Sequence, residues 1–507
     1  MNITKTLFKE YLDLEIYAWY HVHNKEKYEW IQSDTYGSLD DPSEDDLSDM
    51  WDDVEKYFLQ RYNPAEITDI SKYPLDQQIG ATNEAIQRRA PIIYQWTLTT
   101  GDASTIFDVL EYVPESDSYR HIEIKSKSSI RNKSTTTGAY TTLKTDLKQD
   151  LSFSAYILYK NGISIQEHTI AFLNKAYFLN WELKIDKLFI LEPIHDMLIS
   201  FSEIETTIWR ILESLAMNLE QMKQRYPYDG FKYKKYFAEK PPKGTIEILS
   251  SLTWDRYSKA RDADIFNLES IAPEYLEIFT DKQQSFIIRY QKGVSCEQVA
   301  SSDRLKSLEF PLYFYDYETY TSGIPRFQWS HPWQQVFCQY SIHKMERDGS
   351  IQHFEWIIEN GKQDNRDLLD CMMRDLWVLS QGTFISWNAS FENGRNKELI
   401  EMYPKHTNNL QYMINHTFDL MLIFREGLYF DPWCQGSNSL KAVLPALTDI
   451  TYEGMPVGNG MEAMGVIEKI LVWKANDKLI QDCLTYCKQD TWAMVAIYKK
   501  LLEALNA

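Results

Sequence analysis

Two acidic residues separated by one position stand in the aromatic segment FYDYETY, which begins at Phe314. The segment is predicted to be a β-strand, and a strand points alternate side chains to opposite faces, so Asp316 and Glu318 share one face. Two carboxylates on one strand can hold hard divalent cations such as Mg²⁺ or Mn²⁺, and paired cations can hydrolyse a phosphodiester bond. The same pattern occurs on ordinary surface strands, so other acids must support this interpretation.

Supporting residues follow in three later segments. WNASFE contains Asn388 and Glu392 at a predicted strand-to-helix junction, HTFDL contains Asp419, and YCKQD contains Tyr486 and Asp490. On a helix, residues four apart lie one turn apart on one face. Tyr486 is therefore predicted to position an attacking water beside Asp490, which binds a cation. Each segment alone is also compatible with a structural role, and their order along the chain favours a catalytic set.

This order resembles that of the DEDD exonucleases of the tyrosine subtype. The resemblance implies that Asp316, Glu318, Glu392 and Asp490 bind two Mg²⁺ or Mn²⁺ ions and that Tyr486 orients the water. It also implies a 3′ to 5′ direction of hydrolysis. The chain departs from that family at its second motif, where Glu392 stands in place of the usual aspartate. We expect Asn388 to brace the turn before Glu392 or to contact the substrate.

A closer resemblance covers residues 305–502, which look like the bacterial family named domain of unknown function 2779. The segments that carry it are PLYFYDYETY, HPWQQVFCQYSIH, WNASFENGR, GSNSLKAVLPAL and YCKQDTWAMV, in that family's order. This resemblance implies a ribonuclease H-like fold with an exonuclease-type site. It implies no particular substrate.

A second set of chemical residues lies near the N-terminus. In HIEIKSK, Glu123 and Lys125 share one face of a predicted strand, and Asp108 lies on the strand before it. A PD-(D/E)XK nuclease needs these residue types at this spacing. Asp108, Glu123 and the carbonyl of Ile124 would bind a cation, while Lys125 would steady the attacking hydroxide or the negative charge of the transition state.

This N-terminal region is similar to RecB-like nucleases in strand order and in the helix after the motif. It departs from them at Ser154, where a glutamine is usual, and it has no cysteine before Cys296. We therefore expect no iron–sulfur cluster. The site is expected either to bind one or two metal ions and cut, or to serve as a nucleic-acid clamp.

The surrounding patterns predict the elements that position both sets. Alternating strands and a helix over about 143–159 indicate an α/β domain at residues 1–180, with a restriction-endonuclease-like PD-(D/E)XK fold. Amphipathic helices predict a helical bridge at residues 181–306. In residues 307–507 a hairpin turning at Asp348-Gly349, followed by alternating strands and helices, predicts a ribonuclease H-like mixed sheet with flanking helices.

The composition is that of a globular protein of 507 residues with a formal net charge of −20. Much of the acid lies in the segment 34–55, so a local basic groove for nucleic acid remains compatible with this charge. The six cysteines suggest neither disulfides nor zinc, and Cys483 and Cys487 are predicted to be half-buried thiols on one helix face. We find no predicted membrane span or leader and expect a cytoplasmic protein.

The sequence therefore predicts a metal-dependent nuclease that acts on DNA or RNA, with single-stranded ends as the expected substrate. Pairing two nuclease modules suggests nucleic-acid processing, repair or phage defence. Two alternatives stay open. Only the C-terminal domain cuts, or the chain is a catalytically inactive nuclease fold that binds nucleic acid or other partners.

Overall fold

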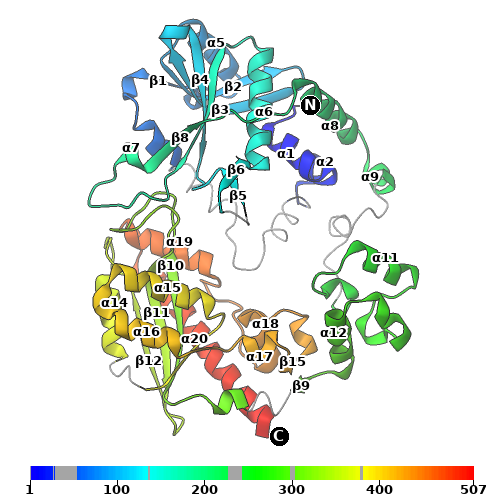
Figure 1. Cartoon of the computed structure of the whole chain (residues 1–507), viewed down its shortest axis with the longest axis vertical. Helices are drawn as coiled ribbons and strands as arrows, with labels where there is room; N and C mark the ends of the chain where they lie inside the picture. The colour runs from blue at the N-terminus through cyan, green and yellow to red at the C-terminus, as the bar shows by residue number, and fades with distance from the viewer. Residues whose placement is uncertain are drawn as a thin grey trace. The chain divides into compact units, whose positions relative to one another are not determined.

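The computed structural model describes residues 2–26, 28, 54–134, 138–225, 243–296, 303–376 and 381–506, so most of the acidic segment 34–55 lies outside the described residues. The chain divides into two compact units. The first contains Met1–Phe237 and Ser322–Gln334, and the second contains Ala238–Thr321 and Gln335–Ala507. Both units combine mixed sheets with helices, which confirms the predicted α/β class (Figure 1).

The first unit is built on a six-stranded mixed sheet in the order β1-β2-β3-β4-β7-β8. Its strands are β1 (Ile67–Asp69), β2 (Ile92–Thr100), β3 (Ala103–Val113), β4 (Ser118–Lys125), β7 (Ile165–Leu173) and β8 (Phe189–Pro193), and β5 (Arg131–Lys133) pairs with β6 (Tyr140–Leu143). Its helices are α1 (Lys5–Asp13), α2 (Glu15–His23), α5 (Gln78–Gln87), α6 (Thr145–Lys160), α7 (Ile185–Leu188), α8 (Phe201–Leu215) and α9 (Leu219–Arg225). Strand β4 pairs antiparallel with β3 and parallel with β7, so it is central.

Two apolar cores hold the central strand of this sheet. One joins Trp96 and Phe107 to Phe8 of α1 and Phe153 of α6, and the rings of Phe8 and Phe153 are 4.8 Å apart. The other contains Ile122 and Ile124 of β4. The alternation along β4 therefore directs its isoleucines into one core and its polar residues toward the opposite side, as the sequence predicts.

The second unit contains a five-stranded sheet in the order β12-β11-β10-β13-β14. The strands are β10 (Leu312–Tyr320), β11 (Val336–Met345), β12 (Ile351–Ile357), β13 (Thr383–Ser386) and β14 (Thr417–Asp419), and β9 (Ser295–Cys296) pairs separately with β15 (Tyr429–Phe430). Strand β11 pairs antiparallel with both β10 and β12, whereas β13 and β14 run parallel to β10. The helices are α11 (Trp254–Asp262), α12 (Asp281–Lys292), α14 (Arg366–Asp375), α15 (Ser390–Met402), α16 (Thr407–Asn415), α17 (Leu422–Arg425), α18 (Leu440–Leu447), α19 (Gly460–Leu471) and α20 (Asp477–Asn506).

Helices cover both faces of this sheet, and β10 is buried between them. Tyr315 and Tyr317 pack in a core with Leu369 of α14 and Leu399 of α15. On the other face, Phe314 packs in a core with residues of α18 and α20. The strand's two-residue period thus separates an aromatic face from a face that carries the two acids.

The residues predicted to form a separate bridge, 181–306, are divided between the units. Strand β8 and helix α8 belong to the first unit, because Phe189 and Ile204 are buried in its cores. Helices α11 and α12 belong to the second. Conversely, Ser322–Gln334, which connects β10 to β11, is part of the first unit, where Ile324 is buried and the indole N–H of Trp333 donates to the carbonyl of Ser126.

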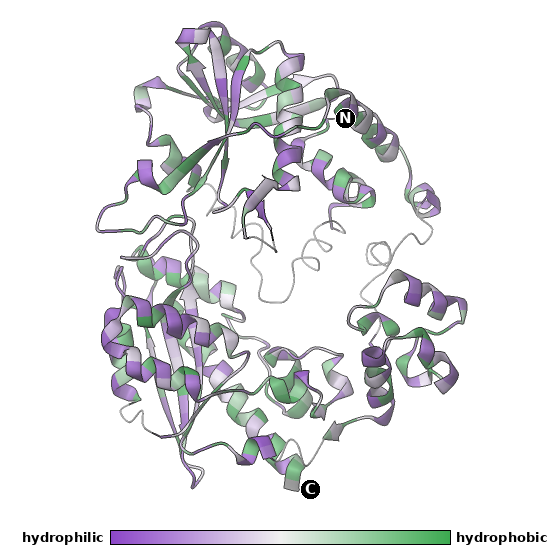
Figure 2. Cartoon of the chain, in the orientation of Figure 1, coloured by the Kyte–Doolittle hydropathy of each residue, from purple (hydrophilic) through white to green (hydrophobic). Residues whose placement is uncertain are grey.

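No helix in the described ranges has both the length and the apolar composition that crossing a membrane requires. The 30-residue helix α20 interleaves hydrophobic and hydrophilic residues along its length (Figure 2).

We predict that Phe314→Ala lowers the free energy of unfolding of the second unit by about 3–5 kcal/mol, because it empties a fully buried site between β10 and α20. The ring of Phe314 lies 5.6 Å from that of Tyr498 on α20. Urea unfolding followed by circular dichroism measures the change. Trp356→Ala on the edge strand β12, where the side chain is 40% exposed, is the control and should cost less. Equal losses in the two variants would contradict this role for Phe314.

Candidate active site

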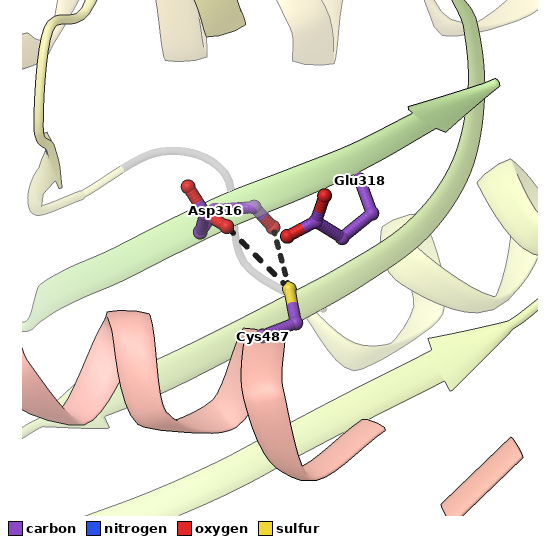
Figure 3. A group of neighbouring side chains, drawn as sticks. All are labelled: Asp316, Glu318 and Cys487. Atoms are coloured by element: carbon purple, nitrogen blue, oxygen red, sulfur yellow. Dashed lines mark hydrogen bonds between the residues drawn. The ribbon is translucent and has the colours of Figure 1, made fainter. Parts of the chain in front are cut away.

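As the sequence predicts, Asp316 and Glu318 share one face of strand β10, and the structure shows that α20 packs on this face. Ligand atoms of Asp316, Glu318 and Cys487 lie within 4.8 Å of one another, and Figure 3 shows the thiol of α20 directed at the two acids of β10. Cys487 Sγ is 3.5 Å from Asp316 Oδ2. Burial, with the nearby charge of Asp316, raises the pKa of Cys487 well above its usual value, so the neutral thiol is a hydrogen-bond donor to the carboxylate.

The acids of this site raise one another's affinity for protons. Burial raises the pKa of Asp316 well above its usual value, and the carboxylates of Asp490, Glu318 and Glu392 raise it further. Glu318, Glu392 and Asp490 are themselves at most 8% exposed. The four acids proposed from sequence as metal ligands are therefore brought within electrostatic range of one another, from three separate elements.

Glu392 reaches the site from the first turn of α15. Asn388 precedes this helix with φ of +68°, its N–H donates to Asp419 Oδ1 at 3.1 Å, and its side-chain oxygen accepts from Ser390. Asn388 thus braces the turn, as one of its two predicted roles requires, and Asp419 holds that turn. Burial, together with the charge of Asp419, raises the pKa of Glu392 to about 8. Its Oε2 is buried, and within the described residues it has no hydrogen-bond partner.

Helix α20 places Tyr486 and Asp490 one turn apart, and both are buried. Asp490 Oδ1 accepts a hydrogen bond of 2.5 Å from the hydroxyl of Tyr452. Burial and the carboxylates of Asp490, Glu318 and Asp316 raise the pKa of Tyr486 far above its usual value, so its hydroxyl stays protonated. The ammonium of Lys441 lies 5.9 Å from the ring centroid of Tyr452 and 5.8 Å from that of Tyr486.

This donor set fits divalent cations. Buried carboxylates that repel one another are relieved when a cation binds, and carboxylate oxygens are the preferred ligands of Mg²⁺ and Mn²⁺. The carboxyl groups supply the oxygen ligands, from Asp316, Glu318, Glu392 and Asp490. The buried Oε2 of Glu392, which accepts no hydrogen bond among the described residues, is available as a metal ligand. The neutral thiol of Cys487 lies beside these oxygens as a hydrogen-bond donor to Asp316, because the thiolate and not the thiol binds metal ions.

The N-terminal residues also come together, with a different balance of charge. Asp108 Oδ2 accepts the N–H of Ile124 at 2.6 Å, and Lys125 Nζ lies 3.0 Å from Glu123 Oε1. The same oxygen of Glu123 accepts the ammonium of Lys5 from α1. Burial alone would raise the pKa of Glu123, but the charges of Lys125 and Lys5 hold it well below its usual value.

Helix α6 contributes an acid that the sequence did not single out. Asp150, which is 4% exposed, pairs with Lys125 at 3.1 Å and with Lys9 of α1 at 2.9 Å. Ser154, at the position compared with glutamine, lies one turn further along α6 and is buried without a hydrogen-bond partner among the described residues. The residue of this helix that reaches the motif lysine is therefore Asp150. Burial and the acids Glu123 and Glu55 raise the pKa of Asp108 to about 8.

Sequence reasoning missed Cys487, Tyr452, Lys5 and Asp150. Cys483 and Cys487 were predicted to be half-buried, whereas both are fully buried. The position of Cys487 three residues before Asp490 was a usable signal, because residues three apart on a helix are neighbours on its surface. No local pattern marked Lys5, which is 118 residues from its partner Glu123.

Comparison with known proteins yields one match. The family model described as a domain of unknown function, DUF2779, matches residues 313–439. The match includes Asp316, Glu318, Glu392 and Asp419 and ends before α20, which carries Tyr486 and Asp490. It bears out the resemblance to that family for this part of the chain. No curated protein and no solved structure matches the chain.

We predict that Asp316→Asn stabilises the metal-free protein and that its advantage over wild type grows as pH rises from about 4.5 to about 8. Raised carboxyl pKa values mean that the folded state holds protons that the unfolded state releases, so the contribution of these groups to stability is present at low pH and is lost through this range. Removing one charge lessens that loss. Thermal midpoints measured in EDTA at pH 5 and pH 8 check it.

Glu503→Gln is the control for this experiment, because Glu503 lies on α20 with 65% of its side chain exposed. It should follow the wild-type pH dependence. Parallel curves for wild type and Asp316→Asn would show that the cluster is not strained by charge repulsion.

Proposed function

We propose that the second unit is a metal-dependent 3′ to 5′ exonuclease with a ribonuclease H-like fold, hydrolysing phosphodiester bonds of DNA or RNA at single-stranded ends. The observation that carries the proposal is the convergence of four acids, the half-buried Asp316 and the buried Glu318, Glu392 and Asp490, from β10, α15 and α20. The sheet order β12-β11-β10-β13-β14, with Asp316 and Glu318 on its central strand, supports the fold assignment.

In this proposal each residue has a defined task. Asp316, Glu318, Glu392 and Asp490 would hold two Mg²⁺ or Mn²⁺ ions, which when bound activate the nucleophile and stabilise the leaving oxygen. The protonated hydroxyl of Tyr486 orients the attacking water, since it lies one turn from Asp490 on the same helix face. Tyr452 fixes the orientation of Asp490 through its hydrogen bond. Lys441, next to both tyrosine rings, supplies positive charge for a substrate phosphate.

The family match gives this proposal a partial context. DUF2779 carries no assigned activity in its description, so the match supports the grouping of residues 313–439 and not the reaction. Within the proposal, the first unit has a PD-(D/E)XK fold of the RecB-like kind and serves as a second nuclease or as a nucleic-acid clamp. A role in nucleic-acid processing, repair or phage defence is consistent with that pairing.

We predict that the purified chain shortens 3′-unlabelled, 5′-labelled single-stranded DNA or RNA stepwise in the presence of Mn²⁺ and that Asp316→Ala abolishes this activity. Loss of one carboxylate removes a donor shared by the proposed metal pair. Denaturing gels of products over time provide the measurement. Glu503→Gln, on the exposed surface of α20, is the matched acid-to-amide control and should retain wild-type rates.

Glu123→Ala is tested beside it to separate the two units. Activity that is lost with Asp316→Ala and kept with Glu123→Ala assigns hydrolysis to the second unit. If pure wild type cleaves neither polymer, the proposal fails in favour of a catalytically inactive nuclease fold that binds nucleic acid or other partners.

We further predict that Tyr486→Phe lowers kcat by about 10²–10⁴-fold, the range expected when a positioned proton-transferring or water-orienting group is removed. Binding of Mn²⁺ should be unchanged, because the phenol is not among the proposed ligands. Single-turnover rates and calorimetric titration with Mn²⁺ measure the two effects separately. A variant with wild-type rate would remove Tyr486 from the mechanism.

A further inference from the structure

Helix α1 directs two lysines at the acids of the N-terminal cluster. Lys5 pairs with Glu123, and Lys9, one turn later on the same helix face, pairs with Asp150 at 2.9 Å. Lys125 contacts both acids, at 3.0 Å from Glu123 and 3.1 Å from Asp150. Each of these two acids therefore faces two ammonium groups, while Glu123 Oε2 lies 3.4 Å from His121 Nε2 and accepts no hydrogen bond among the described residues.

The lysines of α1 are held in place by the fold. Thr4 caps the helix by accepting from the N–H of Leu7 at 3.2 Å. The preceding residue, Ile3, pairs with the start of β3 through two backbone hydrogen bonds. Its N–H donates to the carbonyl of Asp102 at 2.7 Å, and its carbonyl accepts from the N–H of Ser104 at 3.0 Å. Leu7 and Phe8 are buried in the main core of the unit. Because the backbone on both sides of Lys5 is fixed, its ammonium group reaches Glu123 as part of the folded structure.

Lysines dominate the charges around the two paired acids of this cluster. Three ammonium groups, those of Lys5, Lys9 and Lys125, face the carboxylates of Glu123 and Asp150, and the carboxyl group of Asp108 lies within electrostatic range of Lys5 and Lys125. Around Asp316 in the second unit, by contrast, the main charged neighbours are other acids. A divalent cation approaching Glu123 Oε1 would meet two ammonium groups already on that oxygen, and like charges at this distance repel strongly.

We propose that the ammonium group of Lys5 takes the place of a divalent cation at Glu123, so that the N-terminal cluster is a metal-free ion-pair network and the first unit binds neither Mg²⁺ nor Mn²⁺. The PD-(D/E)XK residues Asp108, Glu123 and Lys125 are present. The ammonium group of Lys5, however, occupies the carboxylate oxygen that a metal ion would need. Lys5 then has a structural role, because its charge offsets that of the buried Glu123 carboxylate in the folded unit. This inference is independent of the activity proposed for the second unit, and of the two roles proposed for the first unit it keeps the nucleic-acid clamp.

The test measures Mn²⁺ binding directly, by electron paramagnetic resonance of free Mn²⁺ during titration of the full chain. The background carries Asp316→Asn and Asp490→Asn, so that binding at the second unit is removed. We expect this background to bind no Mn²⁺ at concentrations up to about 1 mM, the weak end of protein affinities for divalent cations. Adding Lys5→Met, which keeps most of the aliphatic stem, should create one Mn²⁺ site, and adding Glu123→Gln to that chain should abolish it.

Lys9→Met is the matched control, because Lys9 lies on the same helix face and pairs with Asp150 rather than Glu123. It should create no Mn²⁺ site. Circular dichroism melts establish that each variant is folded, and Lys5→Ala replaces Lys5→Met if the latter is not. Mn²⁺ binding by the background chain that is lost with Glu123→Gln would overturn the proposal. Failure of both folded Lys5 variants to gain a site would equally overturn the assignment of Lys5 as the occupant.

Discussion

The grouping of four carboxyl groups around strand β10 is the constraint on which the site of the second unit depends. Removing an ionised carboxylate from water is costly unless a partner offsets the charge, and Asp316 is surrounded by further acids. The two apolar cores on either side of β10 oppose relaxation of this arrangement, since Phe314 and Tyr315 are fully buried on opposite faces. The acids are thus fixed in positions where protons or cations must neutralise them.

The first unit meets the same constraint with its own cations. Glu123 and Asp150 are more deeply buried than the acids of β10, yet lysines from α1 and β4 accompany them. Buried ion pairs of this kind keep charge in the interior without an external ligand. The two clusters therefore differ in electrostatic character, although both contain the residue types that nucleases use. One retains uncompensated acid, and in the other the lysines of the chain offset the charges of Glu123 and Asp150.

Much of the second unit's secondary structure could be predicted from local patterns. Hydrophobic periodicity located three elements correctly: the strand with Asp316 and Glu318, the helix after Asn388 and the final helix. The Asp348-Gly349 pair located the turn, where Gly349 has a positive φ. Helix α19 and the short strand β14 were not predicted. The three residues of β14 are too few for a two-residue alternation to be recognised, and β14 is defined by its pairing with β13.

The sequence by itself determined which acids share a face of β10, that Tyr486 and Asp490 share a face of a helix, and that Glu123 and Lys125 project together from β4. These are properties of local periodicity, which the backbone geometry of a strand or helix imposes. Only the tertiary structure decided that Cys487 and Tyr452 contact the acids and that Lys5 reaches Glu123. Such contacts join residues up to 171 positions apart, and they follow from how helices pack on a sheet, which no short segment encodes.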